Sequence, residues 1–382
     1  MAGSRSPAKT KSPSPRADAL EPRLTLLRDR MAALDLDAYL LTHAADIAYL
    51  TGFSGHDSAA IVTARRVTVV TDARYSEELA TDAPQAKAVI RKDAMTEALA
   101  AVLGSAARVG FESNFVTFGT IDGIRASLKK RRKAGKLVPI ADLMLKLRAV
   151  KDAGEVAAIG RAIDVAQSAF TKVVNKIRPG MTEGAVAGQL ILEMRSRGAT
   201  DAAFQPIVAA GAHGSLPHYR PDATVITANA PLLIDWGAIV DGYRSDLTRT
   251  LLIGKVHRKM EEIYRVTLDA NLAAIARLKP GMTGKQADAV ARKLITKAGY
   301  GKQFGHGLGH GIGRDIHEEP RLHYSREKET LVPGMIVTVE PGIYLPGIGG
   351  VRIEDDVRIT DTGCEVLTSL DKSLQWAKTF VG

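Results

Sequence analysis

The sequence contains one cysteine, Cys364, among 382 residues, which excludes a disulfide bond within the chain and favours a reducing compartment. It has no apolar run that approaches the roughly 18 residues a membrane-spanning helix needs. The first residues, MAGSRSPAKTKSPSPR, have no apolar stretch behind their basic side chains, so they do not predict a secretory signal peptide. These absences predict a cytoplasmic protein that does not enter the membrane.

Acidic residues are missing from the start of the chain, where none precedes Asp18, and the formal net charge is +10. A second basic stretch occupies residues 129–133. Either stretch could contact nucleic acid or acidic lipid. No aromatic residues are interspersed with these charges and no nucleic-acid-binding motif accompanies them. We therefore interpret both stretches as solvated and expect no nucleic-acid partner.

Changes in composition along the chain predict a tail and two domains. Residues 1–21 are rich in Ser, Pro and basic residues and are expected to be disordered. Residues 22–147 alternate between helical patterns and β-rich runs such as RRVTVVTD and ARVGFE, which predicts a small mixed α/β domain. Residues 148–382 carry different patterns and are expected to form a second domain.

The second domain contains an internal repeat. Residues 179–182, of sequence PGMT, lie between two helical patterns, and the same four letters recur at residues 280–283 between two further helical patterns. A strand-rich segment with acids in apolar surroundings follows each helix pair. The repeat predicts two half-domains that face each other about a pseudo-twofold axis.

Four acids occupy matching places in the two strand-rich segments. They are Asp235, Asp246, Glu340 and Glu354. In the first segment, Asp241-Gly242 between apolar runs predicts a hairpin turn. That turn pairs Asp235 with Thr248, so Asp246 lies on the same face of the hairpin as Asp235, at a distance that allows the carboxylates to converge.

Converging carboxylates in apolar surroundings would repel each other or become protonated unless cations join them. Arg352, on the strand face of Glu354, is the main basic residue expected nearby, so we predict two divalent metal ions. The Gly-rich segment FGHGLGHGIGRDIHEEP adds histidines, of which one is expected as a ligand and the others as groups that support the ligands or act in catalysis. An oxygen-rich set with one imidazole disfavours structural zinc and favours a hydrolytic pair of Mn²⁺, Co²⁺ or Zn²⁺.

Several segments resemble the metallopeptidase family of aminopeptidase P and prolidase. They are LLIDWGAIVDGYRSDLTRTL, GHGLGHGIGRDIHEEP, VTVEPGIYLPG and VRIEDDVRIT. The resemblance covers about residues 22–378, and the first domain is similar to the N-terminal domain of creatinase. It implies an α/β (α+β) chain in which a creatinase-like domain precedes a catalytic domain of the pita-bread fold.

The resemblance also implies roles for individual residues. Two divalent ions, with Mn²⁺ favoured and Co²⁺ or Zn²⁺ as alternatives, would be held by Asp235, Asp246, His310, Glu340 and Glu354. A hydroxide bridging the ions would attack the peptide bond, with Glu340 as general base. His218 and His317 resemble histidines that bind the substrate carbonyl and stabilise the tetrahedral intermediate. Arg352 resembles an arginine near the active site, and the role of His306 stays open.

The function implied is hydrolysis of the N-terminal Xaa-Pro peptide bond by a homodimer. His218-Tyr219, followed by Pro221, resembles aminopeptidase P more than prolidase. The alternative is a prolidase that accepts only dipeptides, which must bind a free carboxylate. Candidates for that contact are Arg220, Arg314 and Arg321. A creatinase-like hydrolase and a non-enzymatic peptide-binding module of the same fold are further alternatives, and both depart from the ligand set that is intact here.

Overall fold

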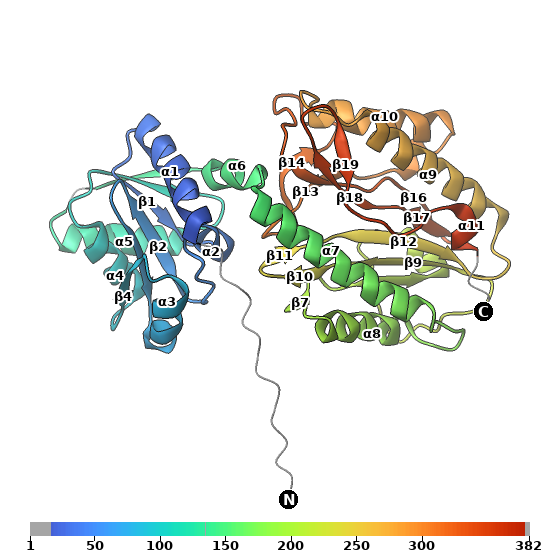
Figure 1. Cartoon of the computed structure of the whole chain (residues 1–382), viewed down its shortest axis with the longest axis horizontal. Coiled ribbons are helices and arrows are strands. Elements are labelled where there is room, and N and C mark those ends of the chain that lie inside the picture. Colours follow the sequence, from blue (N-terminus) through green and yellow to red (C-terminus); the bar gives the residue numbers. More distant parts are fainter. Residues whose placement is uncertain (1–16, 134, 379–382) are drawn as a thin grey trace, which may run out of the picture. The chain divides into compact units, whose positions relative to one another are not determined.

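The structure is a computed structural model that describes residues 17–133 and 135–378, so the basic residues 1–16 lie outside the described part (Figure 1). The chain divides into two compact units between Leu147 and Arg148. Within the described residues, every helix is too short or too polar to cross a bilayer.

The N-terminal unit is built on a six-stranded mixed sheet with the strand order β4-β3-β2-β1-β5-β6. Its strands are β1 (Ala38–Leu41), β2 (Ala59–Thr63), β3 (Val67–Thr71), β4 (Lys87–Ile90), β5 (Arg108–Glu112) and β6 (Lys136–Ile140). Strand β1 is antiparallel to β2 and parallel to β5. The two β-rich runs expected from the sequence form β3 and β5, which confirms them as strands.

Helices cover both faces of this sheet because successive strand residues point to opposite sides. They are α1 (Ala17–Ala33), α2 (Ala44–Thr51), α3 (Ser76–Asp82), α4 (Met95–Leu103), α5 (Phe118–Lys130) and α6 (Leu143–Ala149), with the short 3₁₀ turn η1 (Ala73–Tyr75). Tyr39 and Leu41 pack with α1 and α2 on one face. Leu40 packs with α4 and α5 on the other. Residues 17–21, assigned to the tail from composition, are helical, and Leu20 is buried.

The predicted repeat appears in the C-terminal unit as two helix pairs. The first pair is α7 (Ala153–Val174) and α8 (Glu183–Ser196), and the second is α9 (Arg258–Arg277) and α10 (Gly284–Lys297). Thr182 and Thr283 cap α8 and α10 in the same way, each accepting a backbone N–H with its side chain. Gly180 and Gly281 both have positive φ and donate to the equivalent carbonyls of Ile226 and Leu331. The two halves therefore repeat in detail.

Strands follow each helix pair. They are β7 (Asp201–Ala202), β8 (Ile207–Ala210), β9 (Pro231–Trp236), β10 (Ala238–Val240), β11 (Tyr243–Arg244), β12 (Leu247–Leu252), β13 (Gly309–Gly311), β14 (Glu318–Leu322), β15 (Ile336–Val339), β16 (Gly342–Leu345), β17 (Gly349–Arg352), β18 (Asp355–Ile359) and β19 (Cys364–Val366). Strand β9 pairs with β12 in the first half as β15 pairs with β18 in the second. The predicted hairpin register is confirmed, because Val240 faces Tyr243 and Asp235 faces Thr248.

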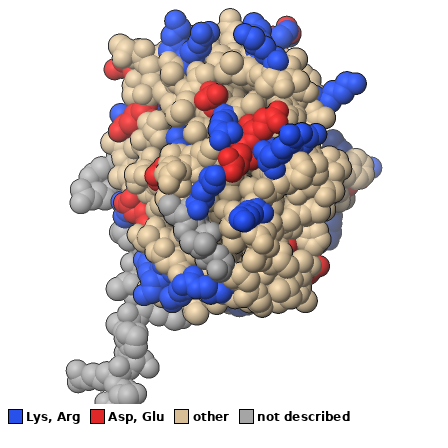
Figure 2. All heavy atoms as spheres, turned by 90° about the vertical axis from the view of Figure 1, so that its right-hand side faces the viewer, with Lys and Arg blue, Asp and Glu red and all other residues tan. Residues whose placement is uncertain are grey.

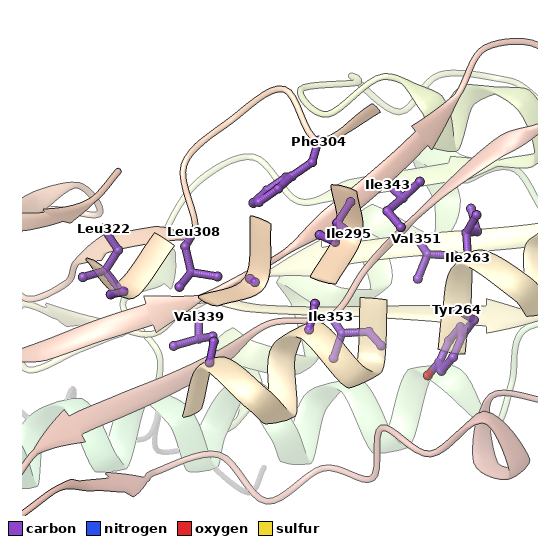
Figure 3. Close-up of a cluster of buried hydrophobic side chains, with 14 of the residues drawn as sticks. Ile263, Tyr264, Ile295, Phe304, Leu308, Leu322, Val339, Ile343, Val351 and Ile353 are labelled. Atoms are coloured by element: carbon purple, nitrogen blue, oxygen red, sulfur yellow. The ribbon is translucent and has the colours of Figure 1, made fainter. Parts of the chain in front are cut away.

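Each half buries its helix pair against its strands. In the first half, Trp236 stacks on Phe170 of α7 with ring centroids 4.0 Å apart and donates its indole N–H to the Ala166 carbonyl. In the second half, Ile263 and Tyr264 of α9 belong to one buried cluster with residues of β15, β16 and β17 (Figure 3). These cores support the strands whose ends carry the acids. The three remaining short elements are η2 (Gly211–Ser215), η3 (Gly301–Gln303) and α11 (Leu374–Ala377).

The surface carries a basic stretch at the end of α5 and charges of both signs on the face drawn in Figure 2. Residues 129–133, at and beyond the end of α5, all have exposed side chains, as expected for a solvated basic stretch. On the face drawn in Figure 2, lysine and arginine side chains are interspersed with acidic ones.

Candidate metal centre

The C-terminal unit contains a cavity of about 670 Å³ lined by residues of both half-domains. The eight residues to which the sequence analysis gave a metal-binding or catalytic role all line it. They are His218, Asp235, Asp246, His310, His317, Glu340, Arg352 and Glu354. Their elements explain the convergence, because β9 and β12 bring the acids of the first half together, and β15 and β18 bring those of the second. Asp235 lies in β9, Asp246 directly precedes β12, Glu340 directly follows β15 and Glu354 directly precedes β18.

Three side chains are arranged so that they could hold a metal ion. One ligand atom from each of Asp246, His310 and Glu354 lies within 4.8 Å of the others, and all three residues are buried. His310 Nε2 lies 3.6 Å from Asp246 Oδ2 and 3.4 Å from Glu340 Oε1. The Nδ1–H of His310 donates to the Gly311 carbonyl at 3.0 Å, which leaves the lone pair of Nε2 directed at the acids.

The electrostatics of these groups fit a cation. Burial, followed by the nearby carboxylates, raises the pKa values of Asp246 and Glu354 well above their ordinary range. Burial raises the pKa of Glu340 to about 7 and lowers that of His310 to about 3. The protein alone therefore favours neutral acids and a neutral imidazole, whereas a bound divalent ion would favour the carboxylates.

Asp235 supplies a second sign that the site fits a cation. Its Oδ1 is buried and has no hydrogen-bond partner among the described residues. Its Oδ2 forms an ion pair with Arg352. A buried carboxylate oxygen without a partner is costly, and a metal ion would satisfy it. The donor set thus fits divalent metal ions, and the assignment of individual ligands stays a prediction.

Arg352 organises the side of the cavity next to Asp235. Besides that ion pair, its Nε donates to Thr248 Oγ1 at 3.0 Å and its Nη1 to the Tyr344 hydroxyl at 2.9 Å. Thr248 donates in turn to Glu354 Oε2 at 2.6 Å. Sequence reasoning placed Arg352 near the acids but did not assign Thr248 or Tyr344 to the site. The hairpin register pointed to Thr248, because it placed this residue opposite Asp235.

Three further histidines that line the cavity, His218, His306 and His317, differ in their contacts and exposure. The ring of His317 meets that of His310 edge to face, with centroids 4.3 Å apart. His306 Nε2 lies 2.9 Å from the Tyr344 hydroxyl, while its Nδ1 is 2.8 Å from the Gly307 carbonyl. His218 is exposed to the cavity from the opposite half-domain. His218 and His317 are therefore both available to a molecule in the cavity.

Basic residues also line the cavity. Of the three arginines proposed for binding a substrate carboxylate, Arg220 and Arg321 line the cavity. Arg314 does not, because it packs over the ring of Tyr243 and donates to its hydroxyl. The sequence did not single out Arg326, which also lines the cavity and pairs with Glu319. Among the described residues, Arg321 makes no ion pair, and burial lowers its pKa.

Comparison with known proteins gives two family matches. The model described as "Metallopeptidase family M24" matches residues 157–361, and that described as "Creatinase/Prolidase N-terminal domain" matches residues 23–150. An uncharacterized peptidase, YqhT, of Bacillus subtilis is 38% identical over 354 residues, covering 92% of this chain and 99% of that protein.

Solved structures are similar over almost the whole chain. An Xaa-Pro dipeptidase from Bacillus anthracis superposes with a TM-score of 0.88 at 36% identity, covering 93% of this chain and 99% of the other. An X-Pro aminopeptidase from Thermotoga maritima gives a TM-score of 0.82 at 34% identity, covering 90% and 99%. A structure named as a dipeptidase and one named as an aminopeptidase are thus both similar to this chain.

Proposed function

Because the chain belongs to metallopeptidase family M24, we propose that it hydrolyses the N-terminal Xaa-Pro peptide bond with the help of two divalent metal ions. It is a peptidase with the pita-bread fold of that family, preceded by a creatinase-like N-terminal domain. The observation that carries the proposal is the convergence of four acids and an imidazole in one cavity. We infer the specificity for proline from the names of two similar structures, an Xaa-Pro dipeptidase and an X-Pro aminopeptidase.

Asp235, Asp246, His310, Glu340 and Glu354 would hold the two ions. Bound divalent ions would polarise the substrate carbonyl and lower the pKa of water at the site. An oxygen-rich set favours Mn²⁺, with Co²⁺ or Zn²⁺ as alternatives.

The remaining steps belong to the protein's own side chains. Glu340 would accept a proton from the attacking water and pass it to the leaving prolyl nitrogen. Without that proton the nitrogen would have to leave as a strongly basic anion, so the transferred proton is needed for its departure. His218 and His317 would donate N–H groups to the substrate carbonyl oxygen as negative charge develops there. Arg352 would keep Asp235 ionised and oriented.

We propose aminopeptidase P-type action as the first candidate, on the strength of the His218-Tyr219 segment. A strict dipeptidase is the second candidate, and Arg321 favours it. This arginine faces the cavity without an ion pair among the described residues, and it could receive the free carboxylate of a dipeptide.

The two candidates are separated by kcat/KM for alanyl-prolyl-alanine and alanyl-proline. A tripeptide value equal to or above the dipeptide value supports the aminopeptidase, whereas cleavage confined to the dipeptide refutes it. If Arg321 binds the dipeptide carboxylate, Arg321→Gln should lower the dipeptide value roughly 10- to 100-fold and leave the tripeptide value nearly unchanged. Arg326→Gln, a neighbouring arginine already paired with Glu319, is the matched control.

Metal dependence is tested directly. Protein stripped with a chelator should be inactive on both peptides and regain activity with Mn²⁺, Co²⁺ or Zn²⁺. Full activity of the stripped protein would refute the metal-dependent reaction. We further propose that the protein is a homodimer, as the family resemblance implies, and that it is cytoplasmic, as its single cysteine favours. Light scattering during size-exclusion chromatography measures the mass of the assembly.

A further inference from the structure

The segment from Ala210 to Tyr219, here called the wall segment, leads into the wall of the cavity, and its last three residues, Pro217, His218 and Tyr219, line the cavity. It contains η2 and continues through Pro217 to His218, which is exposed to the cavity. Among the described residues, the ring of His218 forms no hydrogen bond. Its position is therefore set by how the chain is held on either side of it.

Behind this wall lies Glu183, the first residue of α8, whose side chain is completely buried. Its carboxylate accepts three hydrogen bonds, and all three come from the wall segment. Oε1 accepts from the Ala210 backbone N–H at 2.7 Å and from His213 Nδ1 at 3.1 Å. Oε2 accepts from the Tyr219 hydroxyl at 2.7 Å. The rings of His213 and Tyr219 also stack, with centroids 4.3 Å apart.

On the cavity side, the same segment is held by Arg352. Its Nη1 donates to the Pro217 carbonyl at 3.4 Å, while Nη2 pairs with Asp235. His218 thus lies between two anchored neighbours: Pro217 is tied to the arginine beside the acids, and Tyr219 is tied to Glu183.

In the internal repeat, the second half has no carboxylate at the position equivalent to Glu183. Gly284 occupies the first position of α10, as Glu183 does in α8. A Cβ at Gly284 would lie 2.0 Å from the Arg321 carbonyl oxygen. In the second half, strand β14, which contains Arg321, therefore packs directly against the start of α10. In the first half, the buried Glu183 carboxylate fills the equivalent position and accepts hydrogen bonds from the wall segment.

We propose that Glu183 is a positioning residue that holds the wall segment through Tyr219 and His213 and so places His218 against the substrate carbonyl. This inference rests on the proposed function. It assigns to Glu183 no contact with substrate or metal, because its carboxylate is enclosed by the wall.

The test is a double-mutant cycle on the metal-loaded full chain with alanyl-prolyl-alanine. Glu183→Gln keeps the shape of the side chain but removes the charge, and Tyr219→Phe removes one donor and is the milder variant. Each should lower kcat roughly 10- to 100-fold with a smaller change in KM, because a displacement of about 1 Å is enough for such a loss. In a His218→Ala background, the same substitutions should change kcat less than about twofold.

The proposal would be overturned if Glu183→Gln and Tyr219→Phe lowered kcat by the same factor in the His218→Ala background as in the wild type. That result would show that Glu183 acts independently of His218. The matched control is Glu193→Gln, the same chemical change near the other end of α8, where the carboxylate pairs with Arg197. Its kcat should equal that of the wild type, and a loss equal to that of Glu183→Gln would also overturn the proposal.

Hydrogen exchange provides a readout that does not depend on activity. Amides of residues 210–219 should exchange at least about tenfold faster in Glu183→Gln and in Tyr219→Phe than in the wild type, while those of β9 stay unchanged. Unchanged exchange in the wall would refute the positioning role. If the wild type cleaves neither peptide, the proposed function fails, and exchange still decides whether Glu183 holds the wall. If Glu183→Gln does not fold, Tyr219→Phe carries the same comparison.

Discussion

Replacing the proposed general base by its amide should stabilise the metal-free protein. Without metal ions, burial raises the pKa of Glu340 from its ordinary 4.5 to about 7. Above pH 4.5 the unfolded chain gives up this proton, whereas the folded protein retains it until about pH 7. Folding stability is therefore lost as pH rises through this window. The variant Glu340→Gln carries no such proton and escapes the loss.

The magnitude follows from the two pKa values. Their difference, at about 1.4 kcal/mol per pKa unit, amounts to about 3 kcal/mol at pH 8. The metal-free variant should exceed the metal-free wild type in free energy of unfolding by about that amount at pH 8 and equal it near pH 4.5. For a domain of this size, the corresponding increase in Tm is about 6–12 °C. Contributions from the buried histidines cancel, because both proteins contain them.

Urea unfolding of chelator-treated protein at pH 4.5, 6, 7 and 8 measures this difference. A variant that is less stable than the wild type at pH 8, or a difference that does not vary with pH, would refute the electrostatic reasoning. Adding Mn²⁺ should reverse the order. The wild type should then gain more stability than the variant, because metal binding to the folded state is stronger with the carboxylate present.

The other predictions concern the metal, the histidine pair and the core. Asp246→Asn should lower metal affinity by more than the roughly 10- to 100-fold loss that is typical when a residue hydrogen-bonded to a metal ligand is replaced. A metal content equal to that of the wild type, measured by mass spectrometry, would contradict this. His317→Ala should lower kcat by about 10²–10³ while metal content stays at the wild-type level. Metal loss in that variant would instead make His317 a ligand or a support of one. Phe170→Ala removes the ring under Trp236 and should lower the free energy of unfolding by about 3–5 kcal/mol, as denaturant titration measures.

Repetition made much of the C-terminal unit predictable. The two PGMT segments, each ending in a threonine that caps a helix, and the matched spacing of the acids are local patterns. Such patterns can be predicted from sequence because helix caps and turns depend on residues that are neighbours in the chain. The turn at Asp241-Gly242, where both residues have positive φ, determined the register that faces Asp235 with Thr248. That register in turn placed two acids on one face.

Local reasoning was less accurate at the edges of elements. Composition assigned residues 17–21 to the tail, although they form the first turns of α1. Burial of Leu20 against the N-terminal unit favours the helix there, and this contact depends on the folded core.

By itself, the sequence determined the α/β class, the repeated halves and the four acids that call for cations. The tertiary structure decided which groups meet. It turned Nε2 of His310 toward the acids, paired Arg352 with Asp235 and brought Tyr344 to the same arginine. It also placed Arg321 in the cavity and Arg314 outside it, a distinction that two arginines in one loop-rich segment do not reveal. The physical reason is that a side chain's partners across the cavity depend on how the two half-domains pack against each other, and spacing along the chain does not encode that packing.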